Sequence, residues 1–200
     1  MVDHESRIQK RNKDSIMNAA LEIFSMYGFR GATVDLIANA CGLSKPNLLY
    51  YYQTKEQIHI ELLSRLMDYW LAPLKEMDEN GDPFNEIMGY VRRKLHMSKT
   101  LPRESRLFAN EILQGAPRIN HVLKNDLKTL VDEKALVIQK WIDEGLIAKV
   151  HPYHLIFSIW SLTQHYADFD VQVKAVLVNE DPFENAESYL ETLFSKLLTI

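Results

Sequence analysis

The sequence predicts an all-α protein, and three observations support this fold class. Apolar residues recur at spacings of three and four along almost the whole chain of 200 residues, whereas strand-like alternation is nearly absent. Most of the prolines stand at predicted helix starts, where the missing N–H costs little. Hydrophobic residues make up 46% of the chain, enough for a substantial core. We expect a small domain at residues 1–53 and a larger helical domain at residues 54–200.

The first predicted helix ends at Gly28. Its apolar stripe lies on one face and consists of Ile16, Ala19, Ala20, Ile23, Phe24 and Tyr27. A stripe of this width must be buried. We expect this helix to pack on the next two and to complete a three-helix unit.

Two short helices joined by a tight turn follow. Thr33 is placed to cap a helix over residues 34–40, and Ser44 to cap a second helix. Gly42 permits the left-handed backbone that the turn between them requires. A helix-turn-helix is the natural interpretation, against the alternative of an ordinary helical corner with solvated polar residues.

The second of these helices carries side chains suited to DNA. Lys45 and Asn47 crowd its N-terminal end, where free backbone N–H groups favour a phosphate. Leu48 is four residues before Tyr52, so both are expected to face inward. The tyrosines between them, at positions 50 and 51, can then place hydroxyl groups near a sugar-phosphate backbone.

A long helix is predicted from Lys55 to about Met77. Thr54 and Gln57 form a capping-box pattern at its start. Pro73 should kink or thin the helix near its end.

Prolines open the remaining predicted helices. These helices run from Pro83 to about Leu101, from Pro102 to Gly115, from Pro117 to about Gly145, from Pro152 to about Val173, and from Pro182 to about Leu198. The segment from Pro117 is the longest candidate. Asp181 to Glu184 supplies a cap, a first-turn proline and an acidic third position for the last helix.

Charge is divided unevenly along the chain. The formal net charge is −4 at pH 7. Residues 1–55 hold seven Lys and Arg against five Asp and Glu, a local balance of +2, so the remainder carries −6. This asymmetry favours a phosphate-binding N-terminal part and an acidic body facing away from it. A random fluctuation of a few charges, or a solvated tail, would give the same count.

The composition indicates in which cellular compartment the protein is expected. The lone Cys41 excludes an intrachain disulfide and a thiolate metal cluster, in keeping with a reducing environment. No apolar run approaches the roughly 18 residues needed to span a bilayer. The charged N-terminus lacks the apolar core of a signal peptide. We expect a cytoplasmic protein without a membrane partner.

Enzymatic chemistry is poorly supported. His151, His154 and His165 lie near one predicted helix, but we predict no metal site and no cofactor. Ser161, His165 and Asp168 give a hydrolytic triad on paper, yet no Gly-x-Ser-x-Gly elbow accompanies them. We therefore predict no catalytic residue. An all-helical enzyme acting on a small molecule and a helical protein-interaction module are the alternative classes.

Three N-terminal motifs resemble a known family. These are Gly28–Thr33 (GFRGAT), Cys41–Lys45 (CGLSK) and Leu48–Lys55 (LLYYYQTK). They are similar to the DNA-binding domain of TetR-family one-component transcriptional repressors. The resemblance implies that the helix from about Ser44 to Tyr50 is a recognition helix in the major groove.

The resemblance also implies which residues touch DNA. The candidate DNA-contacting residues are Thr33, Ser44, Lys45, Asn47, Leu48, Tyr50, Tyr51 and Lys55. Within this set, Thr33, Tyr50, Tyr51 and Lys55 would hold phosphates. Many family members carry tyrosine at the position of Leu49, which here is expected to touch a thymine methyl group or to pack inward.

The family plan also implies a homodimer that reads a palindromic operator. One small helix-turn-helix makes few contacts, and pairing two across a twofold axis reads two half-sites. The last two helices would form the interface. Their apolar stripe contains Leu190, Leu193, Phe194, Leu197 and Leu198, and burial within one chain explains it equally well.

A closer resemblance covers the C-terminal part. Trp70–Leu74 (WLAPL), Ser105–Phe108 (SRLF), Gly115–Pro117 (GAP) and Gln164–Phe169 (QHYADF) are similar to regulators of pyrimidine utilisation in enteric bacteria. Those regulators respond to uracil and thymine. The resemblance therefore implies a ligand-responsive repressor with a small pyrimidine effector.

The resemblance implies Trp70, Leu71, Trp160 and Gln164 as ligand-binding residues, and Arg106 is added because it can donate to a carbonyl oxygen. The imide edge of uracil alternates acceptor, donor and acceptor. A glutamine amide both donates and accepts, and Gln164 lies one helical turn after Trp160. Core positions for the tryptophans, and interface positions for Gln164 and Arg106, are the alternatives.

The expected mechanism is a two-state switch. Effector binding would change the spacing between the two recognition helices. The helix from Lys55 is the expected lever, because it starts beside the DNA and ends beside the proposed pocket.

Overall fold

The computed structural model describes residues 6–178 and 180–200, and within these ranges it holds helices and no strand. This confirms the predicted all-α class. In chain order the elements are α1 (Arg7–Gly31), α2 (Val34–Ala40), α3 (Lys45–Tyr51), α4 (Lys55–Lys75), α5 (Pro83–Thr100), α6 (Pro102–Leu113), α7 (Asn120–Val122), a π-helical turn η1 (Leu123–Leu127), α8 (Lys128–Asp143), α9 (Pro152–Asp168), α10 (Asp170–Leu177) and α11 (Ala186–Leu198). No helix in the described ranges is long and apolar enough to cross a bilayer.

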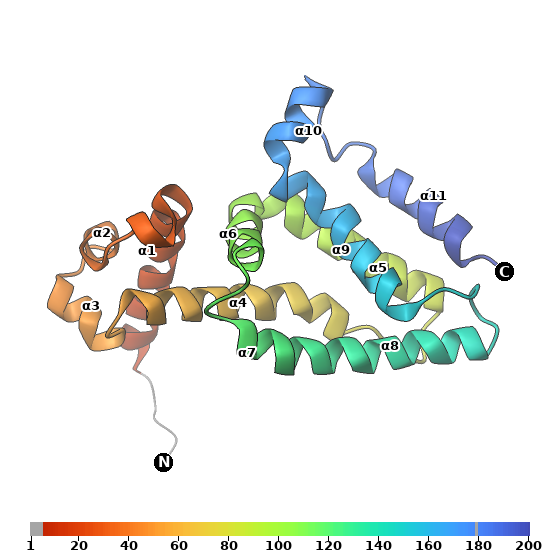
Figure 1. Ribbon diagram of the computed structural model, residues 1–200, viewed down its shortest axis with the longest axis horizontal. Coiled ribbons are helices and arrows are strands. Elements are labelled where there is room, and N and C mark those ends of the chain that lie inside the picture. The colour runs from red at the N-terminus through yellow and green to blue at the C-terminus, as the bar shows by residue number, and fades with distance from the viewer. Residues whose placement is uncertain (1–5, 179) are drawn as a thin grey trace, which may run out of the picture.

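Helices α1, α2 and α3 form a compact unit at one end of the molecule (Figure 1). The predicted stripe of α1 is buried in it, from Ile16 to Phe24. The helical path breaks at Gly28, whose φ of 66° is the left-handed conformation that glycine adopts most readily. Tyr27, predicted on the stripe, is 49% exposed, because this break lies just after it.

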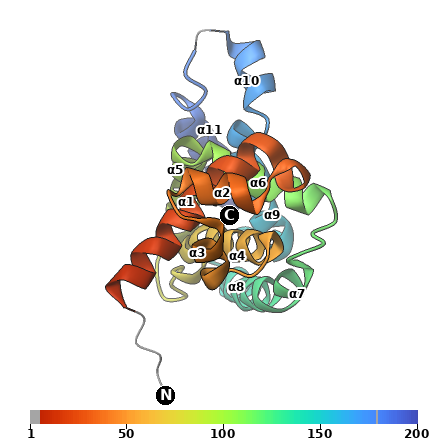
Figure 2. The same ribbon diagram turned by 90° about the vertical axis from the view of Figure 1, so that its left-hand side faces the viewer.

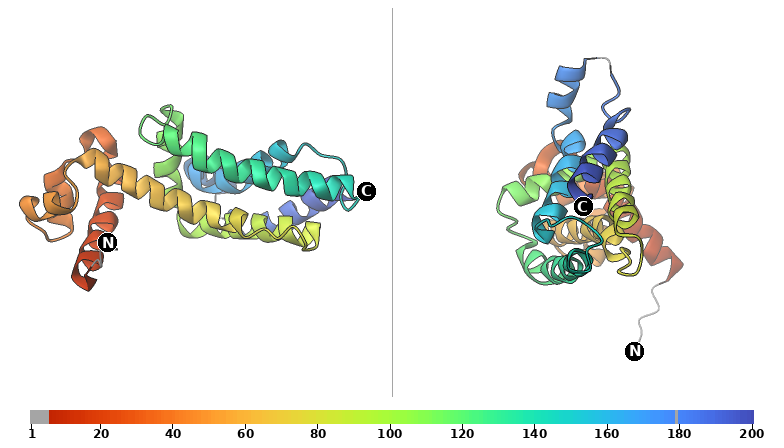
Figure 3. Two further views of the ribbon diagram at one scale, coloured as in Figure 1. Left: turned by 90° about the horizontal axis from the view of Figure 1, so that it is seen from below. Right: turned by 90° about the vertical axis from the view of Figure 1, so that its right-hand side faces the viewer.

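Helix α4 joins this unit to the rest of the chain. It runs from the N-terminal unit along the body of the molecule, beside the length of α8 (Figure 3). Ile58 and Leu62 belong to the N-terminal core, whereas Met67, Leu71 and Leu74 belong to the C-terminal core. Pro73 lies inside α4 near its end at Lys75. Because one helix contributes to both cores, the domain boundary after residue 53 stays a prediction.

The C-terminal body is a layered helical bundle. Helix α5 packs against both α9 and α11, and α8 packs against α9 and α4. Its core includes the large buried side chains Tyr90, Trp141 and Phe194. The body also contacts the N-terminal unit, because α6 packs against α1 and contributes Leu107 to the N-terminal core.

Three predicted helix boundaries are wrong. The helix predicted from Pro117 begins at Asn120, after a turn in which Gly115 and Ala116 have positive φ, and it contains the π-helical turn η1. The last helix begins at Ala186 instead of Pro182, because the Asp181 carboxylate accepts the N–H of Phe183 and closes a turn.

The third wrong boundary is the end of the helix predicted to reach Val173. Helix α9 ends at Asp168, and a break at Phe169 redirects the chain into α10. Helix α10 projects from the body, as the end-on view shows (Figure 2). Val171 and Val176 on it are 79% and 74% exposed.

Candidate DNA-binding face and effector pocket

The helix-turn-helix is built as the capping residues predict. Thr33 Oγ1 accepts the N–H of Leu36 and starts α2, and Ser44 Oγ accepts the N–H of Asn47 and starts α3. Gly42 between them has a φ of 69°. The start of α4 uses a variant of the predicted box, in which Thr54 caps Gln57 and the Gln57 amide oxygen accepts from Gln53.

Helix α3 lies at the end of the molecule that faces the viewer in Figure 2, and several of its polar residues are exposed. Ser44, Lys45 and Asn47 are exposed, and Tyr50 is 74% exposed. Tyr51 is half-buried, with its hydroxyl oxygen accepting from Asn12 Nδ2 at 2.9 Å. This bond ties α1 to the side of the recognition helix.

Lys45 already has a partner. Its Nζ lies 2.8 Å from an Asp35 carboxylate oxygen, and both side chains are more than half exposed. Asp35 lies in the first turn of the neighbouring helix α2, so one acidic group stands within the face that is expected to meet phosphates. The sequence count of charges could not show this pairing.

Two residues of the predicted DNA-contacting set have other roles in this structure. Leu48 has no exposed surface and packs in the core between the helices. It is therefore removed from the set of DNA-contacting residues. Lys55 Nζ donates to the backbone oxygens of Phe29 and Ala32, at 2.7 and 2.9 Å. Lys55 thus fastens α4 to the end of α1. Leu49 is half-buried.

The predicted ligand-binding residues line two adjoining cavities in the C-terminal body. The outer cavity, with a volume of about 460 Å³, lies between α6, η1 and α9 and includes Arg106, Trp160 and Gln164 in its wall. The inner cavity, of about 70 Å³, reaches Trp70 and Leu71 on α4. Trp160 and Gln164 line both, so the cavities are two parts of one candidate pocket.

Aromatic rings form much of the pocket wall. Trp70 meets Phe108 edge-on, with ring centroids 5.4 Å apart. Trp160 donates its indole N–H to the Tyr90 hydroxyl at 2.6 Å, so its polar atom is used and its ring faces the cavity. Desolvation by burial raises the pKa of Tyr90, which therefore stays a neutral acceptor. Within the described residues the Gln164 amide makes no protein hydrogen bond, so it is available to a ligand.

The polar rim of the outer cavity is held by hydrogen bonds to α6. Arg106 donates to the Ala167 carbonyl and lies 3.3 Å from the Asp170 carboxylate. Ser105 donates a short hydrogen bond to Asp168 Oδ1, and burial raises the pKa of that carboxyl group. These contacts bridge α6 to the end of α9, where the chain turns into α10.

One pocket residue, Lys94, was not predicted from the sequence. Its side chain is 3% exposed, lines the inner cavity and places its ammonium group 5.9 Å from the centre of the Trp70 ring. The available signal was its spacing, since Lys94 occupies a core position of α5 together with Ile87, Tyr90 and Val91. A lysine at such a position interrupts an otherwise apolar face.

A second missed group connects the two domains. Glu111, at the end of α6, accepts from Arg118 Nη1 at 2.7 Å and from the Arg118 backbone N–H at 2.9 Å. The Arg118 guanidinium lies 3.5 Å from the centre of the Phe29 ring, on the opposite side of the junction. We call Phe29, His59, Glu111 and Arg118 the junction cluster.

His59 is the buried member of the junction cluster. It packs edge-on against Phe24 and Phe29, with centroid distances of 4.6 and 5.1 Å. Burial lowers its pKa to about 4, against an opposing effect of nearby Glu111. His59 is therefore neutral at pH 7 and contributes packing to the junction.

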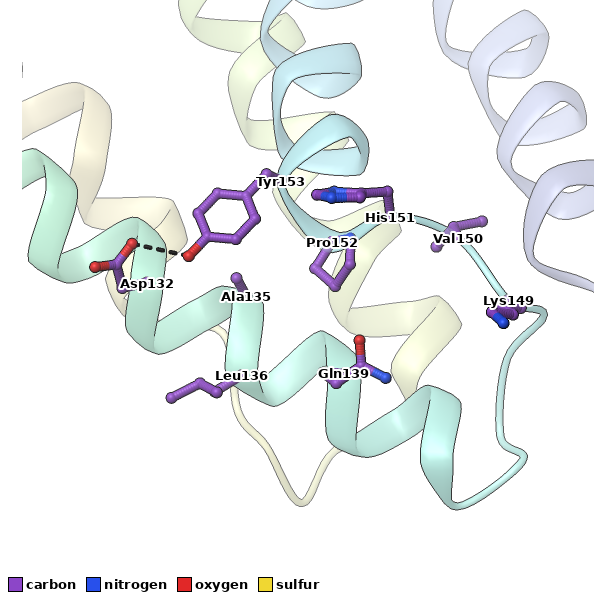
Figure 4. A pocket seen from close by; sticks show the side chains of 9 residues that line it. All are labelled: Asp132, Ala135, Leu136, Gln139, Lys149, Val150, His151, Pro152 and Tyr153. Atoms are coloured by element: carbon purple, nitrogen blue, oxygen red, sulfur yellow. Dashed lines mark hydrogen bonds between the residues drawn. The ribbon is translucent and has the colours of Figure 1, made fainter.

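A larger hollow of about 600 Å³ lies elsewhere, between α8 and the start of α9 (Figure 4). Tyr153 Oη donates to Asp132 at 3.0 Å across it. Leu136 in its wall is 72% exposed, and His151 is exposed as well. This hollow is more open to the surface than the pocket beside Trp160.

The alternative catalytic and metal arrangements are not assembled in the described residues. Ser161 donates to the Phe157 carbonyl, and Asp168 accepts from Ser105, so neither takes part in a triad. No group of three His, Cys, Asp or Glu side chains in the described ranges could hold a metal ion.

Comparisons with known proteins cover nearly the whole chain. The family profile for bacterial regulatory proteins of the tetR family matches residues 16–62, and that for the C-terminal region of YcdC-like proteins matches residues 63–199. The chain is 47% identical over 171 residues to the HTH-type transcriptional regulator RutR of Escherichia coli K12, covering 86% of this chain and 81% of RutR. It is 24% identical over 194 residues to IcaR, the negative regulator of the biofilm operon icaADBC of Staphylococcus aureus strain Newman, covering 92% and 99%.

Solved structures share the fold at lower identity. A transcriptional regulator from Streptomyces coelicolor has a TM-score of 0.74 at 21% identity, covering 94% of this chain and 98% of that one. AibR, solved with isovaleryl coenzyme A and operator DNA, has a TM-score of 0.69 at 18% identity, covering 91% and 97%. Because both family profiles match and RutR is 47% identical, this chain belongs to the TetR family of ligand-responsive, DNA-binding transcriptional regulators and not to an enzyme family.

Proposed function

We propose that the chain is a cytoplasmic repressor that binds a palindromic operator as a homodimer and is controlled by a small planar effector. Uracil and thymine are the effectors that we test first. The observation that carries the proposal is the two-part pocket, in which the unbonded Gln164 amide lies beside the Trp160 ring.

The chemistry of this pocket suits a flat heterocycle. Rings of Trp70, Phe108 and Trp160 provide apolar walls. The Gln164 amide can donate through its NH₂ group and accept through its oxygen, which matches an imide edge. The larger cavity of about 460 Å³ lies within the usual size range of small-molecule sites. The resemblance to regulators of pyrimidine utilisation supports the same effector class.

A path for control runs along α4 and through the junction cluster. Lys55 at the start of α4 holds the end of α1, and Trp70 near its other end lines the inner cavity. Helix α6 lines the outer cavity, and the segment that follows it places the Arg118 guanidinium over the Phe29 ring. Effector binding would move these two connections and change the separation of the recognition helices from the roughly 34 Å of one DNA turn.

Apolar side chains left exposed on α9 and α11 support the dimer. Phe157 is 43% exposed on α9, and Tyr189 and Leu197 are 58% and 43% exposed on α11. Leu190 and Phe194, in contrast, are buried within the chain. Part of the predicted stripe on the last helix is therefore intrachain core, and its neighbouring face supplies the proposed interface.

Selection of bound duplexes from a random DNA pool, repeated with and without uracil and thymine, tests the whole proposal. We expect a palindromic consensus in the absence of effector and a loss of recovered duplex in its presence. A consensus without twofold symmetry would contradict the dimer. Identical recovery with and without both pyrimidines would contradict the effector.

The pocket assignment has its own test. We expect Trp160→Ala combined with Gln164→Ala to raise the effector concentration needed for half-maximal DNA release at least tenfold, because a ring wall and the hydrogen-bonding amide are lost. Fluorescence anisotropy of a labelled operator measures the release. Tyr153→Ala combined with Gln139→Ala is the matched control, since it removes the same types of group from the surface hollow. Unchanged release by the first variant would show that the effector binds elsewhere.

A further inference from the structure

Lys94 is a buried cation without a protein hydrogen bond. Its side chain is 3% exposed, and within the described residues no hydrogen bond and no ion pair of 4.0 Å or less involves its ammonium group. An ammonium group has three donors, and burying it unpaired opposes folding strongly. Because the unpaired ammonium group destabilises the fold, its presence in the core indicates that Lys94 has a role in binding.

The surroundings of Lys94 are mainly apolar and leave its charge unneutralised. The Trp70 ring is on α4, and Leu127 on η1 and Phe108 on α6 complete the apolar wall. On its own helix, Tyr90 is neutral and uses its oxygen to accept from Trp160. No acidic group faces Lys94 from α4, α6 or η1 in the wall of the inner cavity.

Helix α9 supplies the acidic group that acts on Lys94. Asp168 attracts the ammonium group electrostatically, but it lies beyond ion-pairing distance and accepts from Ser105. Arg106 and His165 are the other charged or titratable groups that act on Asp168, and Arg106 is itself paired with Asp170. Asp168 and Arg106 thus have close polar partners, whereas among the described residues the Lys94 ammonium group has neither a hydrogen bond nor an ion pair.

The two cavities order the polar groups along the pocket. Lys94 lines the inner cavity and Asp168 lines the outer one. Gln164 lines both cavities. A ring in the outer cavity would therefore place one of its substituents in the inner cavity, beside Lys94. Gln164 and Asp168 can accept hydrogen bonds from the N–H groups of such a ring.

We propose that Lys94 binds a negatively charged oxygen of the effector, so that the preferred ligands are planar ring acids that also carry an N–H group. The inference rests on the effector pocket proposed above, and it favours anionic rings over neutral rings such as uracil and thymine. A charge-assisted hydrogen bond between an ammonium and an anionic oxygen is roughly twice as strong as a neutral one. A neutral carbonyl oxygen would satisfy one N–H and leave the charge uncompensated.

Binding of the anion should depend on pH. Desolvation by burial lowers the pKa of Lys94 to about 8, and Asp168 partly opposes this shift. The anion needs the protonated amine, so binding is strongest below pH 8 and weakens as the amine loses its proton. Between pH 7 and pH 9 the affinity should fall about tenfold for a single group with this pKa.

Two pairs of probes test the inference with the full chain. Barbiturate, an anionic ring at neutral pH, is compared with neutral uracil, and benzoate is compared with neutral benzamide. Titration calorimetry measures affinity at pH 7 and pH 9, and tryptophan fluorescence gives a second signal from Trp70 and Trp160. We expect at least one anion to bind at least tenfold more tightly than its neutral partner at pH 7.

The variant Lys94→Met removes the charge and keeps the length of the side chain. We expect it to lower affinity for that anion at least tenfold, to abolish the decrease between pH 7 and pH 9, and to change affinity for the neutral probe less than threefold. Lys99→Met is the matched control, because Lys99 lies on the same helix with an exposed side chain paired to Asp181. A thermal melt followed by circular dichroism establishes that both variants fold.

The outcomes separate this inference from the proposed function. If the wild-type protein prefers neither anion, or if Lys94→Met binds the preferred anion as tightly as wild type, the inference is overturned. If the anion binds through Lys94 while uracil and thymine neither bind nor release DNA, the inference stands and the proposal of those two effectors fails.

Discussion

Replacing Glu111 by alanine is expected to lower the free energy of unfolding by about 3–5 kcal/mol, the range observed when one partner of a buried ion pair is removed. The side chains of Glu111 and Arg118 are only 2% and 14% exposed, and their ion pair is 2.7 Å long. The substitution leaves the Arg118 guanidinium buried without its carboxylate. Urea unfolding followed by circular dichroism measures the change.

A surface ion pair provides the control for this prediction. Glu187 pairs with Arg92, and both side chains are more than 40% exposed, so Glu187→Ala should cost less than about 1 kcal/mol. Replacing both Glu111 and Arg118 by methionine should cost less than Glu111→Ala alone, because no charge is left buried. Equal effects of Glu111→Ala and Glu187→Ala would show that the junction pair contributes no more than a surface contact.

The Glu111–Arg118 pair lies between the effector pocket and the DNA-binding unit, so its loss should also affect function. Helix α6 lines the outer cavity through Arg106 and Asn110, and Glu111 follows directly in the same helix. Through Arg118, the same segment touches the Phe29 ring of the DNA-binding unit. Loss of Glu111 should therefore weaken the effect of effector on DNA affinity as well as stability, since one connection between pocket and recognition helix is lost.

The sequence predicted the N-terminal unit well because its signals are local. A capping hydroxyl acts on a backbone N–H three residues later, and Gly42 adopts its left-handed conformation within the turn it forms. Leu48 and Tyr52 face inward as their spacing requires. The helix boundaries in this unit follow from such near-neighbour rules.

Helix boundaries in the C-terminal part were harder to predict, because prolines there occupy either the first turn of a helix or the turn before it. Pro83, Pro102 and Pro152 begin helices, as predicted. Pro117 and Pro182 instead lie in turns that precede their helices, and in the second case the Asp181 carboxylate stabilises the turn. A proline at a first helical turn and one in a preceding turn share the same sequence pattern.

The pocket was predicted in part, since the family resemblance supplied residues and the fold brought them together. Trp70 and Trp160 are 90 positions apart, and only the packing of α4 against the rest of the bundle places them around one cavity. The spacing of Lys94 marks a core position of α5, but its place in the wall of a cavity depends on tertiary contacts, and so does the Glu111–Arg118 ion pair. The residues that were not predicted are therefore those whose role depends on a bound ligand or on contacts made only in the folded chain.

Replacing Lys45 by methionine and Tyr51 by phenylalanine together is expected to weaken operator binding at least about 30-fold. A dimer would lose four contacts to phosphate, each worth about 0.5 kcal/mol or more. Lys45 is exposed and Tyr51 half-buried, and neither change removes apolar core, so the protein should stay folded. The slope of log affinity against log salt should become shallower by about 2, because each dimer loses two cationic phosphate contacts. Fluorescence anisotropy across salt concentrations measures both quantities.

Asp35 supplies the complementary test of the same face. Its carboxylate lies 2.8 Å from Lys45 Nζ and would stand near the phosphates in a complex. Asp35→Asn should therefore tighten DNA binding severalfold, because it removes a repulsive charge and releases Lys45 from its partner. Lys128→Met, at an exposed lysine of α8 in the C-terminal body, should change neither affinity nor salt slope. If the Lys45 and Tyr51 variant bound as tightly as wild type, or if Lys128→Met had the larger effect, the surface of α3 would not be the one that meets DNA.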